Sequence, residues 1–222
     1  MIETGNSLHY VYRAPEKVEA DRKSPLLILL HGFGSNEQDL ISFAPHLDER
    51  FFIVSPRAPF KTDHGGNAWF DLRYTPQGMS VNLGQAAESR QVLLDFVDEI
   101  ATKHDLDAKR VFLAGFSQGA IMIYSLILTE PEKFAGAVTM SGRLVTENLP
   151  GIAAAERLRG FPLLITHGTY DYVLLVDNGR AARDYFEKLP VELDYREYPV
   201  EHNISEQSLA DVSGWLRDRL ES

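Results

Sequence analysis

The sequence contains no cysteine. This absence excludes disulfide bonds, thiolate nucleophiles and cysteine-ligated zinc. Long hydrophobic runs are also missing, since the longest strongly apolar run in the first half of the chain, residues 26–30, is far too short to cross a bilayer. Residues 1–7 have neither the basic segment nor the apolar core of a signal peptide. We therefore expect a cytoplasmic protein with no stable membrane insertion.

Basic residues are scarce as well, because 22 Lys and Arg stand against 32 Asp and Glu, for a formal net charge of −10 at pH 7. A negative field repels phosphate backbones and anionic lipids, so nucleic acid is not an expected partner. Hydrophobic residues make up 44% and charged residues 24%, the balance of an ordinary globular protein. A length of 222 residues fits one α/β domain, and we expect residues 1–222 to form it.

Continuous apolar runs alternate with amphipathic stretches along the chain. Such runs are typical of strands that are buried on both faces of a sheet. The predicted strands are residues 8–12, 25–30, 51–54, 110–114, 134–140, 161–166 and 191–198, and the predicted helices are residues 37–47, 85–104, 120–129, 178–189 and 206–220. This alternation predicts an α/β fold with a mostly parallel central sheet and helices on both faces. In such sheets the active crevice lies at the carboxyl ends of the strands.

Residues 60–83 show no clean periodicity. Gly65, Gly66 and Pro76 interrupt this stretch, and Trp69 and Phe70 make it aromatic. We expect a long ordered loop here, and ordered loops of this length are more often functional than not.

The segment Gly115-Phe116-Ser117-Gln118-Gly119 lies between a predicted strand and a predicted helix. A strand that feeds a very tight turn and then a helix places Ser117 at the apex in a strained backbone conformation. The two glycines suit this turn, because neighbouring backbones come too close there for a β-carbon. The pentapeptide arises by chance in many proteins, but its context favours a nucleophile elbow over a plain strand-to-helix turn.

A serine nucleophile needs an adjacent base, which a third group holds in place. In α/β hydrolases the three groups follow in the chain order serine, acid, histidine. Five histidines precede Ser117, namely His9, His31, His46, His64 and His104. Of the other two, His167 directly follows a strand and precedes a glycine, which is typical of a structural partner of the backbone. His202 lies between the last predicted strand and the last helix, so it is the expected base.

Three carboxylates compete for the role of the acid. Asp171 lies at the carboxyl end of the predicted strand 161–166, where it can orient the imidazole through its Nδ1 proton. Asp177 is better interpreted as the cap of the helix that begins near residue 178. Glu201 is adjacent to His202 in the chain and is expected to point elsewhere. We therefore predict Asp171 as the acid.

The oxyanion of an acyl-transfer reaction needs two backbone donors. One is the amide of Gln118, which follows the nucleophile at the start of a helix. The second is expected in the loop after an earlier strand, here His31-Gly32-Phe33-Gly34, with Phe33 as the donor. Alone, this loop is an ordinary glycine turn; together with the elbow it favours an oxyanion hole.

Six motifs occur in the order that one family shows. They are Leu30-His31-Gly32-Phe33-Gly34, Pro56-Arg57-Ala58-Pro59, Trp69-Phe70-Asp71, Gly115-Phe116-Ser117-Gln118-Gly119-Ala120, His167-Gly168-x-x-Asp171-x-Val173 and the terminal His202. Along nearly its whole length the chain resembles the phospholipase/carboxylesterase family, which includes the acyl-protein thioesterases. The resemblance implies a compact α/β-hydrolase fold without a large cap domain, and hydrolysis of carboxylic esters and thioesters.

The resemblance also implies roles for individual residues. The family's nucleophile falls on Ser117, its acid on Asp171 and its base on His202, while its oxyanion donors fall on Phe33 and Gln118. The implied acyl-enzyme mechanism needs no metal and no cofactor. One departure is Glu201, where the family commonly has glycine before the histidine, and this charge bears on the pH optimum and the range of substrates.

The substrate is less constrained than the chemistry. Trp69, Phe70 and Val173 are candidates to line an acyl pocket, with a purely structural core role for Trp69 and Phe70 equally open. We expect a serine carboxylesterase that acts on esters of small to medium acyl groups. Acyl-protein thioesterase or lysophospholipase activity is the alternative; a peptidase, a lactone hydrolase or a non-catalytic binding protein of this fold also remains open. A homodimer is compatible with the sequence but is not indicated by it.

Overall fold

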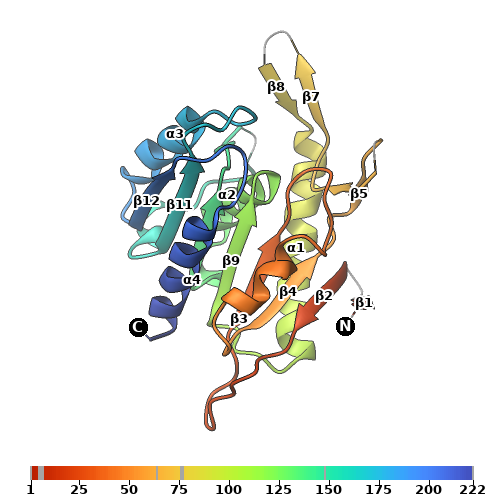
Figure 1. The fold of residues 1–222 in the computed structure, drawn as a ribbon, viewed down its shortest axis with the longest axis vertical. Helices are drawn as coiled ribbons and strands as arrows, with labels where there is room; N and C mark the ends of the chain where they lie inside the picture. The colour runs from red at the N-terminus through yellow and green to blue at the C-terminus, as the bar shows by residue number, and fades with distance from the viewer. Residues whose placement is uncertain (1, 5–7, 64, 76–77, 148, 222) are drawn as a thin grey trace.

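The computed structural model describes residues 2–4, 8–63, 65–75, 78–147 and 149–221 (Figure 1). Side chains are described for these residues except 2–4, 73–75 and 78–79. Two residues considered above, His64 and Pro76, therefore lie outside the described part of the chain.

An eight-stranded sheet forms the centre of the molecule, in the order β1-β2-β4-β3-β9-β10-β11-β12. Its strands are β1 (Ile2–Thr4), β2 (His9–Arg13), β3 (Leu26–Leu30), β4 (Phe52–Pro56), β9 (Val111–Phe116), β10 (Gly136–Met140), β11 (Pro162–Gly168) and β12 (Glu192–Tyr198). The six strands from β4 to β12 in this order are parallel, and β1 and β2 add an antiparallel edge. The predicted mostly parallel sheet is thus present, and β1 is a strand that the sequence pattern did not indicate.

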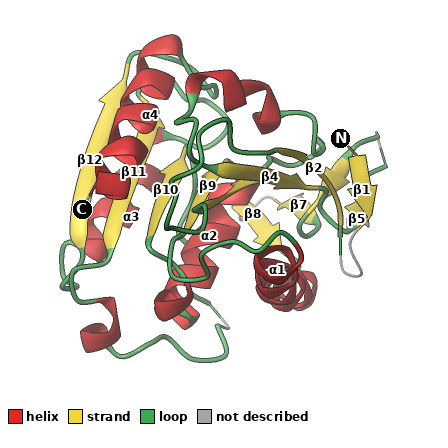
Figure 2. Cartoon of the chain, turned by 90° about the horizontal axis from the view of Figure 1, so that it is seen from below, coloured by secondary structure: helices red, strands yellow, loops and turns green. Residues whose placement is uncertain are grey.

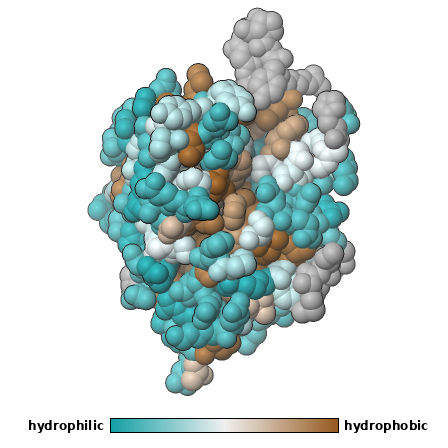
Figure 3. Space-filling model, in the orientation of Figure 1, coloured by the Kyte–Doolittle hydropathy of each residue, from teal (hydrophilic) through white to brown (hydrophobic). Residues whose placement is uncertain are grey.

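Helices cover both faces of this sheet (Figure 2). They are α1 (Leu83–Lys103), α2 (Gln118–Thr129), α3 (Val176–Phe186) and α4 (Glu206–Glu221), with 3-10 turns η1 (Leu40–His46), η2 (Pro131–Lys133) and η3 (Ala155–Leu158). One apolar core joins α1, α2 and α3 to one face of the sheet, and a second core joins η1 and α4 to the other. In the orientation of Figure 1, apolar side chains line a hollow near the middle of the face that carries η1 and α4 (Figure 3).

Parallel pairing sets the positions of the loops that matter for function. β9 lies between β3 and β10, and β11 lies between β10 and β12. The loops that follow β3, β9, β11 and β12 therefore meet along one edge of the sheet, because parallel strands end on the same side. No inserted domain interrupts the alternation of strands and helices in the described ranges.

The stretch 60–83, predicted as a long ordered loop, contains regular secondary structure. It contains two small hairpins, β5 (Phe60–Lys61) with β6 (Asn67–Ala68) and β7 (Leu72–Thr75) with β8 (Gly78–Val81). The second hairpin projects beyond the rest of the molecule at the top of Figure 1. Helix α1 begins two residues earlier than predicted, because the Asn82 side chain accepts a hydrogen bond from the Gln85 amide and caps it.

Two further predictions about helices were wrong. Residues 37–47 form the 3-10 turn η1 from Leu40 rather than an α-helix, and Pro45 inside it cannot donate an α-helical hydrogen bond. Asp177 is not the cap of α3, because the helix begins at Val176 and Leu175 occupies the cap position. Asp177 lies in the first turn instead, where its exposed carboxylate is 3.3 Å from Arg180.

Candidate active site

Three of the predicted residues form one chain of hydrogen bonds at the carboxyl edge of the sheet. The Ser117 Oγ lies 2.9 Å from Nε2 of His202, and Nδ1 of His202 lies 2.6 Å from Oδ2 of Asp171. The imidazole is mostly buried and its ring centre is 4.8 Å from that of Phe116. With Nδ1 donating to the carboxylate, Nε2 is unprotonated and can accept the serine proton.

Ser117 occupies the tight turn between β9 and α2. Its backbone angles are φ 54° and ψ −114°, outside the regions that L-residues usually adopt. Gly119 makes the turn possible, because a β-carbon there would lie 2.0 Å from the Leu30 carbonyl oxygen. The Ser117 amide donates to the Met140 carbonyl at 2.9 Å, which holds the turn against β10. Contacts with β3 on one side and β10 on the other therefore hold Ser117 in its strained conformation.

The loop after β11, residues 169–175, which is called the acid loop below, holds Asp171 in place. This residue is buried, and its Oδ1 accepts the amides of Val173 and Leu174 at 2.9 and 2.8 Å. These bonds leave Oδ2 for His202. A charged carboxylate in this position is satisfied by three donors, which offsets the cost of its burial.

His167 lies beside the acid but not in the hydrogen-bond chain. Its Nε2 is 2.7 Å from the Leu174 carbonyl, to which it donates, and 3.5 Å from the Asp171 carboxylate. Burial lowers the pKa of His167 and outweighs the Leu174 carbonyl and Asp171, both of which favour the protonated ring. A neutral His167 therefore supports the acid loop, as the sequence predicted for a structural partner of the backbone.

The two predicted oxyanion donors, Phe33 and Gln118, belong to segments that adjoin Ser117. Gln118 is the first residue of α2, so its amide has no acceptor within the helix. The loop after β3, residues 31–34, carries Phe33 and is called the oxyanion loop below. It packs on Ser117, since a β-carbon on Gly32 would lie 3.4 Å from the serine β-carbon. The segments that carry the two predicted donor amides therefore lie next to Ser117.

The three residues predicted to line an acyl pocket occupy different environments. Trp69 is fully buried, and its indole donates to the His31 carbonyl at 3.0 Å. Phe70 is buried too, but it lines a small apolar cavity together with Ile121 and Met122 of α2. Val173 is 43% exposed on the acid loop.

The loops that carry Phe33 and Asp171 expose several apolar side chains. Phe33 of the oxyanion loop is 44% exposed, and Tyr172 and Leu175 of the acid loop are 72% and 61% exposed. The sequence prediction did not include Tyr172, which stands next to Asp171 and before the apolar run 173–176. It also missed the buried side chain of Gln118, for which a single sequence holds no signal. Glu201, the departure from the family pattern, has an exposed side chain.

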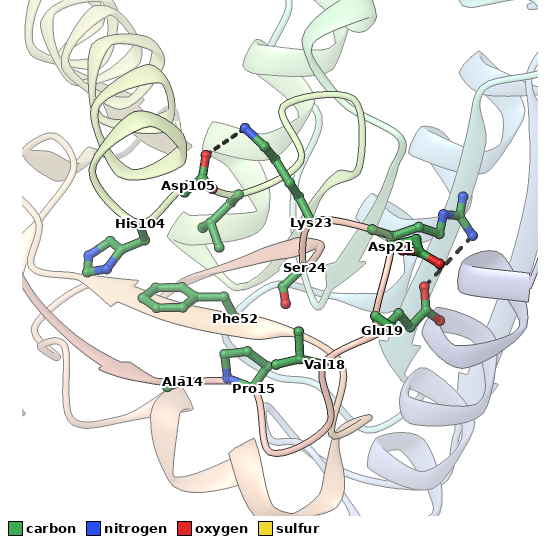
Figure 4. A pocket seen from close by; sticks show the side chains of 13 residues that line it. Ala14, Pro15, Val18, Glu19, Asp21, Lys23, Ser24, Phe52, His104 and Asp105 are labelled. Atoms are coloured by element: carbon green, nitrogen blue, oxygen red, sulfur yellow. Dashed lines mark ion pairs between the residues drawn. The ribbon is translucent and has the colours of Figure 1, made fainter.

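A larger cavity lies far from this site. It has a volume of about 680 Å³ and is lined by residues 14–15 and 18–24, Phe52 and residues 104–106 (Figure 4). Phe52 begins β4, so this cavity lies at the amino ends of the parallel strands, away from Ser117. Two ion pairs join residues of its lining, Lys23 with Asp105 at 2.6 Å and Arg22 with Glu19 at 3.9 Å. Over the residues that the structure describes, no group of three or more His, Asp or Glu side chains is arranged so that it could hold a metal ion.

Comparison with known proteins adds to this geometry. A family model described as phospholipase/carboxylesterase matches residues 16–220. A probable carboxylesterase of Oryza sativa subsp. japonica is 26% identical over an alignment of 228 positions, which covers 94% of this chain and 83% of the relative. Acyl-protein thioesterase 1 of Debaryomyces hansenii is 28% identical over 212 residues, covering 87% of this chain and 90% of the relative.

The fold is shared with solved structures. A carboxylesterase from Mesorhizobium loti superposes with a TM-score of 0.82 at 25% identity, covering 98% of each chain. None of the helices described here is both long and apolar enough to cross a membrane.

Proposed function

The chain belongs to the phospholipase/carboxylesterase family, and on that basis we propose that Ser117, His202 and Asp171 carry out hydrolysis of carboxylic esters. The family match confirms the resemblance predicted from the sequence motifs, and the solved relative confirms the α/β-hydrolase fold. Relatives named carboxylesterase and acyl-protein thioesterase support a serine hydrolase that acts on ester bonds.

One observation carries the assignment of roles. It is the unbroken hydrogen-bond chain from Ser117 Oγ through His202 to Asp171, with links of 2.9 and 2.6 Å. Each link has the polarity that nucleophilic catalysis requires, because the serine donates to a free imidazole nitrogen and the carboxylate accepts from the other.

The first half-reaction forms an acyl-enzyme. Ser117 Oγ attacks the ester carbonyl while its proton passes to Nε2 of His202, and Asp171 stabilises the resulting imidazolium. The negative oxygen of the tetrahedral intermediate accepts hydrogen bonds from the amides of Phe33 and Gln118. The C–O bond of the leaving group then breaks, and His202 returns the proton to the departing alcohol.

The second half-reaction repeats these steps with water. His202 takes a proton from a water molecule that attacks the acyl-enzyme carbonyl, and the same two amides stabilise the second oxyanion. Collapse of this intermediate releases the carboxylic acid and returns the proton to Ser117. No other group is required for the proton balance.

The loops beside Ser117 bear on which acyl groups the protein accepts. Phe33, Val173 and Tyr172 offer partly exposed apolar surface on the two loops beside the serine. Such a surface can shield the apolar carbons of an acyl group from water, and we propose that the acyl groups are of small to medium length. The formal charge of −10 disfavours nucleic acid as a partner.

A series of p-nitrophenyl esters tests the proposal. We expect turnover by the wild type, with a chain-length optimum among the short and medium acyl groups. We expect Ser117→Ala to lose this activity and its labelling by a fluorophosphonate, while circular dichroism stays unchanged. The absence of both turnover and labelling in the wild type would refute an esterase at this site.

Thioester hydrolysis is the second candidate, because the Debaryomyces hansenii relative is named acyl-protein thioesterase. The same serine, base and oxyanion donors serve a thioester, which differs only in its leaving atom. A matched pair of substrates with one acyl group, as oxygen ester and as thioester, separates the two activities. A higher kcat/KM for the thioester would assign the protein to thioesterase chemistry.

A further inference from the structure

The side chain of Gln118 is buried and uses all of its polar atoms within the protein. Its Oε1 accepts the Trp69 amide at 2.8 Å, and its Nε2 donates to the Phe70 carbonyl at 2.6 Å. Because a backbone amide only donates and a carbonyl only accepts, these partners determine the orientation of the Gln118 amide group. The residue after the nucleophile therefore ties the segment 69–70 to the first turn of α2.

Trp69 extends this connection to the loop after β3. Its indole Nε1–H donates to the His31 carbonyl at 3.0 Å, and the two rings lie 5.5 Å apart. Both side chains are fully buried. A displacement of Trp69 is therefore transmitted to the backbone at His31, since close-packed interiors do not absorb such shifts.

The backbone at His31 in turn sets the direction of the Phe33 amide. Nε2 of the His31 ring accepts the Ala58 amide at 3.1 Å, so the proton is on Nδ1, which donates to the Gly32 carbonyl at 2.8 Å. The Gly32 carbonyl and the Phe33 N–H belong to one planar trans peptide and point in opposite directions. Holding the carbonyl thus aims the amide away from the ring.

We propose that the Gln118 side chain is a positioning element of the oxyanion hole, acting through Trp69 and His31 on the Phe33 amide. Gln118 then has two separable parts: its backbone supplies one oxyanion donor, and its side chain fixes the other donor relative to the first. A fixed distance between two donors matters because they stabilise an oxyanion only where both reach it. This inference rests on the esterase function proposed above.

Two variants test the connection at different links. Gln118→Met removes both side-chain hydrogen bonds with nearly the same length of chain and leaves the backbone amide in place. Trp69→Phe removes the indole N–H and keeps an aromatic ring. We expect each to lower kcat with p-nitrophenyl esters by roughly 10- to 100-fold, less than the 10²–10³-fold that follows complete loss of one donor. KM should change little, because the effect is confined to the transition state.

The affinity for an alkyl boronic acid distinguishes positioning of the oxyanion hole from a purely structural role, which would leave this affinity unchanged. The boronic acid adds to Ser117 as a tetrahedral anion, so its affinity reports on the oxyanion hole without turnover. We expect its Kd to rise by the same factor by which kcat/KM falls. We also expect the double variant to lose no more than the more damaging single variant, because both links belong to one pathway.

Ser89→Ala is the matched control. The Ser89 hydroxyl donates to the Trp69 carbonyl at 2.5 Å, so this variant also removes a buried hydrogen bond from Trp69 but leaves the path to His31 intact. We expect a similar loss of thermal stability with kcat/KM close to that of the wild type. An equal loss of activity in Ser89→Ala, additive losses in the double variant, or wild-type activity in Gln118→Met would overturn the inference. A wild type that neither turns over nor labels would instead refute the esterase function.

Discussion

Asp171 binds His202 with one carboxylate oxygen and its own loop with the other. Oδ2 accepts from Nδ1 of His202 at 2.6 Å, while Oδ1 accepts the amides of Val173 and Leu174. Two loop amides therefore hold the Asp171 carboxylate in the position from which it accepts the imidazole proton. Because the two oxygens have different partners, replacing Asp171 by asparagine tests the bond to His202 while the bonds to the loop amides remain.

We predict that Asp171→Asn lowers kcat by about 10⁴-fold. Asparagine has one oxygen, and the two loop amides retain it, so its NH2 group faces Nδ1 of His202. The imidazole must then carry its proton on Nε2, where it cannot accept the proton of Ser117. Ester hydrolysis measured alongside circular dichroism checks this prediction.

Asp177→Asn is the control for that substitution, because Asp177 is the rival acid and its side chain is 80% exposed beside Arg180. We expect full activity from this variant. Strong loss in Asp177→Asn together with activity in Asp171→Asn would reverse the assignment of the acid.

A pair of neighbouring glycines tests the support of the oxyanion loop. Gly65 and Gly66 both have positive φ, 89° and 78°, so alanine strains the backbone similarly at each. Only at Gly66 does the new β-carbon meet the oxyanion loop, 1.9 Å from the Gly34 carbonyl oxygen, whereas at Gly65 nothing lies within 4 Å. We predict that Gly65→Ala lowers the free energy of unfolding by about 1 kcal/mol through this strain alone, and that Gly66→Ala lowers it by more, because its β-carbon must also displace the Gly34 carbonyl.

Activity is expected to separate these two variants. Gly66→Ala must push Gly34 away from its hydrogen bond to the Asn67 carbonyl, and with it the Phe33 amide, so we predict a fall in kcat/KM of roughly 10- to 100-fold. Gly65→Ala should keep nearly full activity. Equal kcat/KM values for the two would show that this contact does not support catalysis.

The sequence predicted those parts of the molecule whose signal is local. The run that forms β3 is apolar at every position because the strand is buried on both faces, and the glycines of the elbow fit its tight turn. The hairpins β5–β6 and β7–β8 escaped prediction because their strands have only two to four residues, too few to show a period.

The hydrogen bonds that support the oxyanion loop could not be predicted from the sequence either. The bond between Trp69 and His31 joins residues 38 positions apart, and that between Gln118 and Trp69 joins residues 49 apart. The composition around Trp69 indicates only an aromatic segment. From the sequence alone, a role in lining a pocket and a role in the core are equally compatible with it. Its hydrogen bonds depend on tertiary packing, which a single sequence does not encode as a pattern.

Stability should depend on pH through His167. Burial lowers the pKa of this ring below the ordinary histidine value of about 6.5, so the folded protein keeps it neutral where the unfolded chain binds a proton. The unfolded state therefore gains protons as the pH falls through about 6.5, and the free energy of unfolding decreases with it. Above that pH the neutral ring carries no such penalty. His31, whose pKa burial also lowers, adds to the same trend.

Urea unfolding between pH 5 and pH 7.5 measures this dependence. We predict that His167→Gln reduces the slope of the unfolding free energy by up to about 1.4 kcal/mol per pH unit, the contribution of one proton. Glutamine can still donate to the Leu174 carbonyl but does not titrate in this range. The remaining slope belongs in part to His31. An unchanged slope in His167→Gln would show that His167 titrates alike in both states.

Glu37 is a buried carboxylate whose charge depends on Arg57. The guanidinium donates to both carboxylate oxygens, at 2.6 and 2.5 Å, and these bonds hold the pKa of Glu37 below its usual value. Glu37 is 3% exposed and the Arg57 side chain 35%. Removing Arg57 alone would strand a negative charge in the interior, which costs more than removing both charges.

We predict that Arg57→Gln lowers the free energy of unfolding at pH 7 by about 3 kcal/mol, the lower end for a broken buried pair, because Arg57 is partly exposed. The double variant Arg57→Gln with Glu37→Gln should lose less than Arg57→Gln alone, since no unpaired charge then remains. Urea unfolding of the two single variants and the double variant forms the cycle that measures the coupling. A double variant less stable than Arg57→Gln would mean that Glu37 stabilises the fold through groups other than Arg57, with His9 at 3.7 Å the nearest such partner.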